Sequence, residues 1–213
     1  MLVVKELQKY FSGRPLYRPL NFSLQQKEVL VVSGPSGSGK TTLLKILCGL
    51  EKPSFGSVEF LGRDITRLSP AAMPYLRRNM GFIFQDFRLI PHMKVWENIA
   101  LPLWIRGEDR IKERVEREMD RLGISALASR MPLTLSGGEQ QLVAIARVAV
   151  MEPVVVLADE PLGSLDKDSG DMVAKALMDL VDRGAGMLIA THDTTLHARL
   201  NARSLKLERP DEG

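Results

Sequence analysis

The apolar positions in the first part of the chain fall into short runs that predict strands. Residues 2–7 (LVVKEL), 20–24 (LNFSL) and 29–34 (VLVVSG) are such runs, and only QQKE joins the last two. Because so short a connection is typical of a hairpin, we expect the strands at 20–24 and 29–34 to pair antiparallel. An edge strand is predicted at residues 56–62 (GSVEFLG), and a buried strand at 80–85 (MGFIFQ).

The rest of the chain mixes helical spacing with continuous apolar runs. Leucines recur at helical intervals soon after Gly34, and residues 87–150 have a helical character with few β-branched runs. The last part alternates a buried strand at 154–160 (VVVLADE), a helix at 170–184 and a final buried strand at 187–193 (MLIATHD). Strand–helix alternation around continuous apolar strands predicts an α/β fold whose parallel sheet is covered on both faces.

Composition and charge add limits to this picture. With 213 residues, 45% hydrophobic and 26% charged, the chain is long enough for one sizeable globular domain. The net charge of +3 gives no argument for nucleic acid as a partner. The single cysteine, Cys48, cannot form an intramolecular disulfide, which suits a reducing compartment. The longest apolar run, residues 99–105, is too short to span a membrane, so a membrane role needs a partner.

The strand at 29–34 leads into GPSGSGKTT, which matches the phosphate-binding pattern G-x-x-x-x-G-K-S/T. Small residues let backbone N–H groups turn toward a phosphate, and the following helix adds partial positive charge. Lys40 supplies a full charge to the β- and γ-phosphates, and Thr41 offers a hydroxyl to Mg²⁺. The predicted nucleotide contacts are Gly34, Pro35, Ser36, Gly37, Ser38, Gly39, Lys40, Thr41 and Thr42.

An acidic pair follows the apolar run at 154–158. Asp159 is predicted at the carboxyl end of a strand, where α/β folds place ligands, and we expect it to help hold Mg²⁺. Glu160 is positioned to orient and deprotonate a water that attacks the γ-phosphate. The alternative is a solvated loop, because Asp-Glu pairs often follow strands. The phosphate cradle favours the catalytic interpretation.

The base of the nucleotide is less well defined by the sequence. No N/T-K-x-D motif for guanine is present, which favours adenine or a nonspecific grip. Tyr10, between two early strands, could stack on the purine ring, or it could be ordinary strand packing.

The stretch LSGGEQQ at residues 135–141 offers a second place for an anion. Ser136 and Glu139 have the spacing of a capping box, in which each side chain binds a free N–H group at the helix start. That leaves Gly137 and Gly138 unexplained, since glycine in a helix costs up to about 1 kcal/mol relative to alanine. Glycine is expected there if a phosphate comes close to the backbone N–H groups.

Six motifs in order, GPSGSGKT, the FQ that ends at Gln85, LSGGEQQ, LADEP, GSLD and ATHD, resemble the nucleotide-binding subunit of ABC transporters over essentially the whole chain. The resemblance implies a P-loop (RecA-like) core with a parallel sheet, an N-terminal antiparallel β subdomain and an inserted helical subdomain. It divides the single domain 1–213 into an α/β core at 1–86 and 150–213 and a helical signature subdomain at 87–149. It also implies a homodimeric ATPase, with ATP and Mg²⁺ between the cradle of one chain and the LSGG helix of the other.

The same resemblance implies roles for particular residues. Gln85 would sense Mg²⁺ and water and couple to a membrane partner, and His192 would contact the γ-phosphate, unless it is only a satisfied polar residue at a strand end. Asp166 would lie in the loop that crosses the dimer. The predicted catalytic residues are Glu160, His192, Lys40 and Gln85, the Mg²⁺ ligands are Thr41, Gln85 and Asp159, and the ATP contacts outside the cradle are Tyr10, Ser136, Gly137, Gly138, Glu139 and Asp166.

Residues 62–103 narrow the resemblance to FtsE-type cell-division ATPases, with LolD-type lipoprotein-releasing ATPases and the ATPase domain of MacB-type exporters as relatives. This branch implies that ATP-driven dimer closure sends a mechanical signal through an FtsX-like integral membrane subunit to cell-wall hydrolysis, from a cytoplasmic position at the inner face of the membrane. Residues 87–104 are the expected contact for that subunit, and packing between subdomains is the alternative. A lipoprotein-releasing ATPase and a slowly hydrolysing, ATP-dependent dimerisation scaffold remain alternative functions.

A few positions depart from the family pattern. Leu142 stands where arginine is usual after LSGGEQQ, and Leu162 and Ser164 replace the usual residues of DEPT-G-N. Lys27 stands where a turn glycine is common. None of these changes removes a predicted phosphate ligand or the base, although Leu142 removes a charge from the signature helix.

Overall fold

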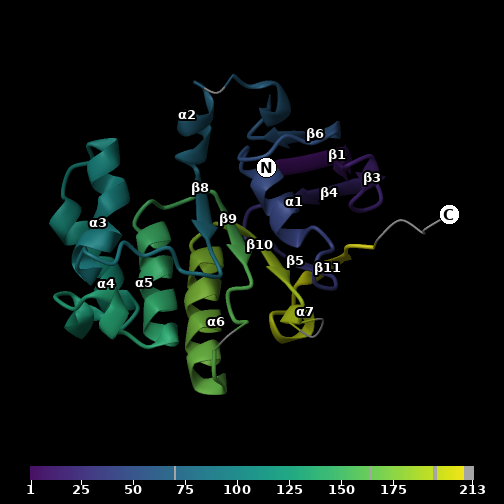
Figure 1. The fold of residues 1–213 in the computed structure, drawn as a ribbon. Coiled ribbons are helices and arrows are strands. Elements are labelled where there is room, and N and C mark those ends of the chain that lie inside the picture. The colour runs from purple at the N-terminus through teal and green to yellow at the C-terminus, as the bar shows by residue number, and fades with distance from the viewer. Residues whose placement is uncertain (70, 164, 194–195, 209–213) are drawn as a thin grey trace.

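The computed structural model describes residues 1–69, 71–163, 165–193 and 196–208. A five-stranded sheet lies at its centre, with strands in the order β11-β5-β10-β9-β8, all parallel (Figure 1). The strands are β5 (Val29–Ser33), β8 (Met80–Ile83), β9 (Val155–Asp159), β10 (Gly186–Thr191) and β11 (Arg203–Lys206). The strands β5, β9 and β10 are buried along their whole length, as continuous apolar runs predict.

Helices pack on both faces of this sheet, on one of them together with a second sheet described below. They are α1 (Lys40–Leu47), α2 (Met73–Arg77), α3 (Val95–Arg106), α4 (Ile111–Arg121), α5 (Gly137–Ala149), α6 (Lys167–Asp182) and α7 (Leu196–Arg199). Short 3₁₀ helices span Ile65–Arg67, Ser125–Leu127 and Pro132–Thr134. Within the described residues, no helix is both long and apolar enough to cross a membrane.

Alternate side chains of the central strands enter two different cores. Val29 and Val31 of β5 join the core formed with α3, α4, α5 and α6. Leu30 and Val32, one position along, join the core formed with α1 and the antiparallel sheet. Figure 1 shows these layers on opposite sides of the parallel sheet. The predicted parallel sheet with both faces covered is therefore confirmed.

A second sheet is antiparallel and has the strand order β4-β1-β6-β7. Its strands are β1 (Leu2–Gln8), β4 (Leu20–Leu24), β6 (Phe55–Phe60) and β7 (Arg63–Asp64), and a separate hairpin pairs β2 (Tyr10–Phe11) with β3 (Arg14–Pro15). The predicted N-terminal antiparallel part of the fold is confirmed.

The predicted hairpin across QQKE is wrong. β4 pairs with β1, whereas β5 lies in the other sheet between β10 and β11. The connection turns through Lys27, which has a positive φ of 58°, and the Gln25 N–H donates to the Glu28 carboxylate at 2.8 Å. Because β5 is apolar on both faces, it is better satisfied inside the covered parallel sheet than beside the half-exposed β4.

Two smaller expectations about strands are also wrong. β6 is not an edge strand, because the chain turns back after it and β7 pairs with its end. The strand β10 is not the last one, because β11 follows and pairs in parallel with β5. β11 is short, and three of its four residues are exposed, so it leaves no apolar run in the sequence.

The segment at 87–149 contains α3, α4 and α5. Helix α5 packs against α3 and α4 and also against α6, so residues of all four helices share one core. The division of the chain into an α/β core and a helical subdomain at these boundaries stays a prediction.

Candidate active site

The loop between β5 and α1 lies at the carboxyl end of the parallel sheet. Gly37 and Gly39 have positive φ values of 74° and 95°, a region in which other residues are strained. A Cβ on Gly39 would lie 2.4 Å from the Leu16 side chain, so the loop is also closely packed from outside. Glycine at position 39 is thus required both by the backbone and by its neighbour.

The side chain of Lys40 returns into this loop. Its Nζ donates to the carbonyls of Gly34 at 2.8 Å and Pro35 at 3.3 Å, and the residue is only 8% exposed. The Ser38 hydroxyl is also buried and has no hydrogen-bond partner within the described residues. A buried hydroxyl without a hydrogen-bond partner costs free energy, so a polar ligand that bonds to Ser38 would stabilise the loop. The charge of Lys40 favours an anion as that ligand. Pro35, Ser36 and Thr42 lie at or near the surface of the same loop and helix.

Thr41 joins the loop to strand β9. Its Oγ1 donates to Asp159 Oδ2 at 2.7 Å, across 118 positions of sequence. Burial raises the pKa of the Asp159 carboxyl and the nearby charge of Glu160 adds to this, while the Thr41 hydrogen bond and the Lys40 charge oppose it. A bound cation would relieve this cost of burying a carboxylate.

A carboxylate and a hydroxyl in contact fit a hard cation such as Mg²⁺. Mg²⁺ keeps several waters and needs only one or two protein oxygens. Within the described residues no group of three His, Cys, Asp or Glu side chains could hold a metal ion. The donor set at Thr41 and Asp159 therefore fits a cation shared with a phosphate ligand.

Glu160 lies at the centre of the site. Its backbone N–H donates to the Ala190 carbonyl at 2.8 Å, and its φ is 45°, a strained value for a residue with a side chain. One carboxylate oxygen lies 3.8 Å from Lys40 Nζ. The other accepts from Thr191 Oγ1 at 2.9 Å and lies 3.0 Å from His192 Nδ1. The side chain is 11% exposed, so a nearly buried carboxylate is held in one orientation.

Sequence reasoning found His192 and missed Thr191. His192 has a side chain that is 65% exposed, and its Nδ1 lies against Glu160. Thr191 both donates to Glu160 and accepts from the Asp193 N–H at 3.1 Å, so it fixes the loop as well as the carboxylate. The signal for Thr191 was its place at the end of a buried strand, directly before His192.

Gln85 follows β8 at the same edge of the sheet. Because β8 pairs in parallel with β9 and Ile83 is in register with Ala158, residue 85 is at the level of Glu160 along the neighbouring strand. Gln85 is exposed. The register places it beside the strand that carries Asp159 and Glu160, and its roles toward water and Mg²⁺ stay predictions.

At the start of α5, the capping box predicted for LSGGEQQ is confirmed. The Ser136 hydroxyl accepts from the Glu139 N–H at 3.2 Å, and the Ser136 N–H donates to the Glu139 carboxylate at 2.7 Å. A Cβ on Gly138 would lie 2.8 Å from the Ser169 side chain, so packing within the chain explains that glycine. Gly137 is exposed, and its Cβ would meet only Leu165 at an ordinary 3.5 Å.

Two predicted ATP contacts have other partners in this structure. Asp166 caps helix α6 by accepting from the Ser169 N–H at 3.0 Å and from its hydroxyl at 2.7 Å, and these hydrogen bonds lower the pKa of the Asp166 carboxyl. Tyr10 packs edge-on against Phe55, with ring centroids 5.7 Å apart. Strand packing, the alternative for Tyr10, is thus present, and base stacking stays a prediction.

Leu142 and Leu162, two departures from the family pattern, are packed. Leu142 is 7% exposed and belongs to the core beneath α5, and Leu162 packs against the same core. Ser164 lies outside the described residues. The neighbouring Gln141, which sequence reasoning missed, is 1% exposed and donates through Nε2 to the Pro161 carbonyl at 3.1 Å. It joins the signature helix to the loop that follows Glu160.

A glycine-rich loop between a buried parallel strand and a helix, with its lysine beside Glu160 and the next residue, Thr41, bonded to Asp159, defines a P-loop nucleotide-binding protein. The ABC transporter family model matches residues 17–163, and the chain belongs to this family. It binds ATP and is an ATPase of the ABC type.

Similar proteins extend across nearly all of the chain. The cell division ATP-binding protein FtsE of Escherichia coli (strain K12) is 43% identical over 200 residues, which cover 93% of this chain and 90% of that protein. The lipoprotein-releasing system ATP-binding protein LolD of Shewanella sp. (strain MR-4) is 42% identical over 178 residues, covering 82% and 77%. The ATP-binding cassette MJ0796, solved as a dimeric post-hydrolysis state bound to ADP and Pi, superposes with a TM-score of 0.87 at 33% identity, covering 98% and 94%.

Proposed function

We propose that two copies of this chain close head to tail around two ATP molecules, and that hydrolysis lets them open again. The observation that carries this proposal is the contrast between two elements of one chain. The cradle holds a buried lysine beside Glu160, whereas the turn at residues 136 and 137 is exposed and has room for a ligand. The dimeric form of the similar cassette MJ0796 supports the same arrangement.

In this mechanism Lys40 neutralises the β- and γ-phosphates, and the Ser38 hydroxyl gains a partner from the same ligand. Thr41 and Asp159 would hold Mg²⁺, which supplies charge neutralisation at the phosphates when bound. Glu160 accepts a proton from the attacking water, and Thr191 and His192 keep its carboxylate in place. Gly137 of the other copy would offer its backbone N–H group to the γ-phosphate, beside the exposed Ser136.

Dimer closure depends on the γ-phosphate because both copies contact it. ADP lacks that group and cannot make the shared contact, so hydrolysis removes the reason for closure. A change from 1% to 99% closed needs about 5.5 kcal/mol of differential binding, which is within reach of a few charged hydrogen bonds.

The Lys40→Ala variant should bind ATP about 10- to 100-fold more weakly, because it removes the buried charge that faces the phosphates. Fluorescence titration with a labelled ATP analogue measures this directly. Lys45→Ala is the matched control, since Lys45 is an exposed lysine on the same helix. Unchanged affinity in the Lys40 variant would contradict the assigned role.

The output of the cycle is proposed to be a signal to an FtsX-like membrane subunit that controls septal cell-wall hydrolysis. Similarity to FtsE over nearly the whole chain supports this proposal, and similarity to LolD supports the alternative of a lipoprotein-releasing complex. The proposed contact at residues 87–104 has two parts. Val95, Ile99 and Leu103 are buried in the core, as the packing alternative requires, whereas Trp104 is 43% exposed.

A charged residue on the exposed part should break that contact. We expect Trp104→Glu, or Ile105→Glu at the adjoining 75% exposed position, to abolish copurification with a coexpressed FtsX-like subunit while ATP binding stays normal. Met172→Glu is the matched control, because Met172 is 54% exposed on α6. Copurification that survives both α3 changes would remove this surface from the proposal.

A further inference from the structure

The C-terminal end of helix α5 is held by arginines from three other segments. Their guanidinium groups donate to carbonyls at and just beyond the end of the helix, where positive charge is favourable. The pairs are Arg183 with Ala149, Arg114 with Val150 and Arg106 with Met151.

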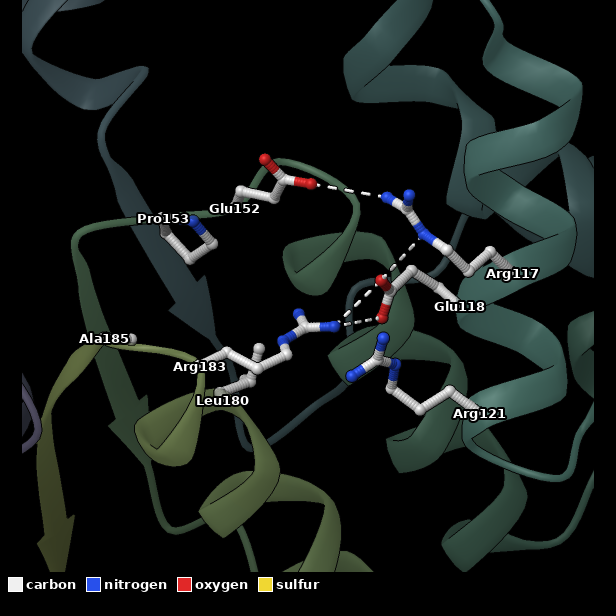
Figure 2. A pocket seen from close by; sticks show the side chains of 8 residues that line it. All are labelled: Arg117, Glu118, Arg121, Glu152, Pro153, Leu180, Arg183 and Ala185. Atoms are coloured by element: carbon white, nitrogen blue, oxygen red, sulfur yellow. Dashed lines mark hydrogen bonds and ion pairs between the residues drawn. The ribbon is translucent and has the colours of Figure 1, made fainter.

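A cavity of about 360 Å³ adjoins this end of the helix (Figure 2). Arg183 also binds both oxygens of the buried Glu118 carboxylate at 2.8 Å, and Arg117 pairs with Glu152 across the cavity. The arginines that line the cavity are thus paired with acidic side chains of the same chain. The arrangement fixes α5 relative to α4 and α6.

Arg147, on the last turn of α5, points its guanidinium elsewhere. Nη2 donates to the Phe87 carbonyl at 2.7 Å and Nη1 to the Arg88 carbonyl at 2.6 Å. Within the described part of the chain no ion pair is formed by Arg147. Burial lowers the pKa of the Arg147 guanidinium, but arginine stays charged in proteins. The bonds to the two carbonyls therefore offset the free-energy cost of burying part of this cation.

The backbone that Arg147 holds is strained. Phe87 and Arg88 have positive φ values of 56° and 48°, and neither is glycine. Such conformations persist only where the surroundings hold them. A planar guanidinium that bonds two consecutive carbonyls fixes two peptide planes at once, which a lysine ammonium does less well. These peptide planes come directly after Gln85 and Asp86.

We propose that Arg147 is a positioning residue that fixes the backbone after Gln85 to the signature helix, and so sets the approach of Gln85 to the nucleotide. The proposal rests on the ATPase cycle proposed above and on the role predicted for Gln85 toward Mg²⁺ and water. Because Arg147 belongs to the helix that begins with the signature turn, and the other arginines hold the same C-terminal end of that helix, Arg147 makes the orientation of Gln85 depend on the position of α5.

The first test measures the backbone and needs no nucleotide. In Arg147→Gln, hydrogen exchange of the peptide covering residues 84–92 should be roughly tenfold faster, because two charged hydrogen bonds to this segment are lost. Arg114→Gln is the matched control: it removes a bond from a guanidinium to the Val150 carbonyl, directly after the end of α5. It should leave exchange at 84–92 unchanged. Equal exchange in Arg147→Gln and the parent would overturn the proposal.

The second test measures hydrolysis. Arg147→Gln should lower kcat by about 10- to 100-fold with little change in the KM for ATP, since misplacing a reacting group costs rate while the cradle is intact. Arg147→Lys should restore part of the rate, and it also serves if the glutamine variant does not fold. Loss of rate in Arg114→Gln to the same extent would show that Arg147 acts only through stability and would overturn the proposal.

The double variant Gln85→Ala/Arg147→Gln separates this proposal from the one it rests on. If Arg147 acts through Gln85, the double variant should be no slower than the slower single variant, because residues acting as a unit are not additive. Additive losses would overturn the role of Arg147 and leave that of Gln85 standing. Parental hydrolysis by Gln85→Ala alone would instead overturn the role predicted for Gln85, and the inference with it.

Discussion

Glu160→Gln is expected to bind ATP normally and to hydrolyse it about 10²- to 10⁴-fold more slowly, the range over which a general base contributes. The amide oxygen can still accept from Thr191, which keeps the shape of the site. It cannot take a proton from water, so the chemical step loses its base. Phosphate release under saturating ATP measures the rate, and size exclusion with light scattering tests for an accumulated closed dimer.

The expected dimer is the sharper part of this result. If hydrolysis is what opens the dimer, the slow variant should stay closed with ATP and stay monomeric with ADP. Glu152→Gln is a matched control, because that carboxylate is exposed and pairs with Arg117 away from the cradle. Hydrolysis at the parental rate by Glu160→Gln would show that another group is the base.

The site residues that could be predicted from the sequence are those in motifs, because the chemistry of the site constrains the spacing of the residues in a motif. GPSGSGKTT fixes a strand, a loop and a helix in order, and Lys40 does lie inside that loop. Thr191 contacts Glu160 and Gln141 contacts the loop that follows Glu160, across 31 and 20 positions of sequence, and no local sequence pattern identifies either residue. The sequence indicates them only as polar residues in apolar surroundings: Thr191 ends a buried strand, and Gln141 lies on the apolar face of a helix.

Strand pairing was harder to predict than strand existence. The runs at 20–24 and 29–34 are both strands, yet their partners are β1 and β10 rather than each other. The pairing depends on which distant segments cover the two faces of each strand, and the four-residue connection QQKE carries no information about those segments. The strand β11 was not predicted because its residues, most of them exposed, form no apolar run in the sequence. Its partner β5 is far away in the sequence, so no local pattern indicates their pairing.

The two glycines of the signature turn have different surroundings in the structure. Close approach of a phosphate was the expected reason for both Gly137 and Gly138. The Ser169 side chain already crowds Gly138, so a side chain there would disturb the contact between α5 and α6 in a single chain. Gly137 has room for a side chain in the monomer, so crowding by the described residues does not account for it, and its contact with a phosphate stays a prediction.

Gly137→Asp should therefore leave the monomer folded and prevent the ATP-driven dimer. An acidic residue in the first turn of a helix is favourable, and the 3.5 Å contact with Leu165 can accommodate a Cβ, so the melting temperature should change little. Against a γ-phosphate the new carboxylate would be repelled at close range, which costs several kcal/mol. Size exclusion in the Glu160→Gln background should then find monomers with ATP, and hydrolysis in the parental background should be lost.

Two comparison variants show whether the loss of dimers and hydrolysis in Gly137→Asp comes from the interface or from unfolding. Gly137→Ala adds a Cβ without charge and should dimerise more readily than Gly137→Asp, whereas Gly138→Ala should lower the melting temperature because its Cβ meets Ser169 at 2.8 Å. A Gly137→Asp chain that melts like the parent but no longer dimerises places the effect at the interface between copies. Dimers that persist with ATP in that variant would mean that the exposed turn at residues 136 and 137 meets no phosphate, and the composite site proposed here would have to be abandoned.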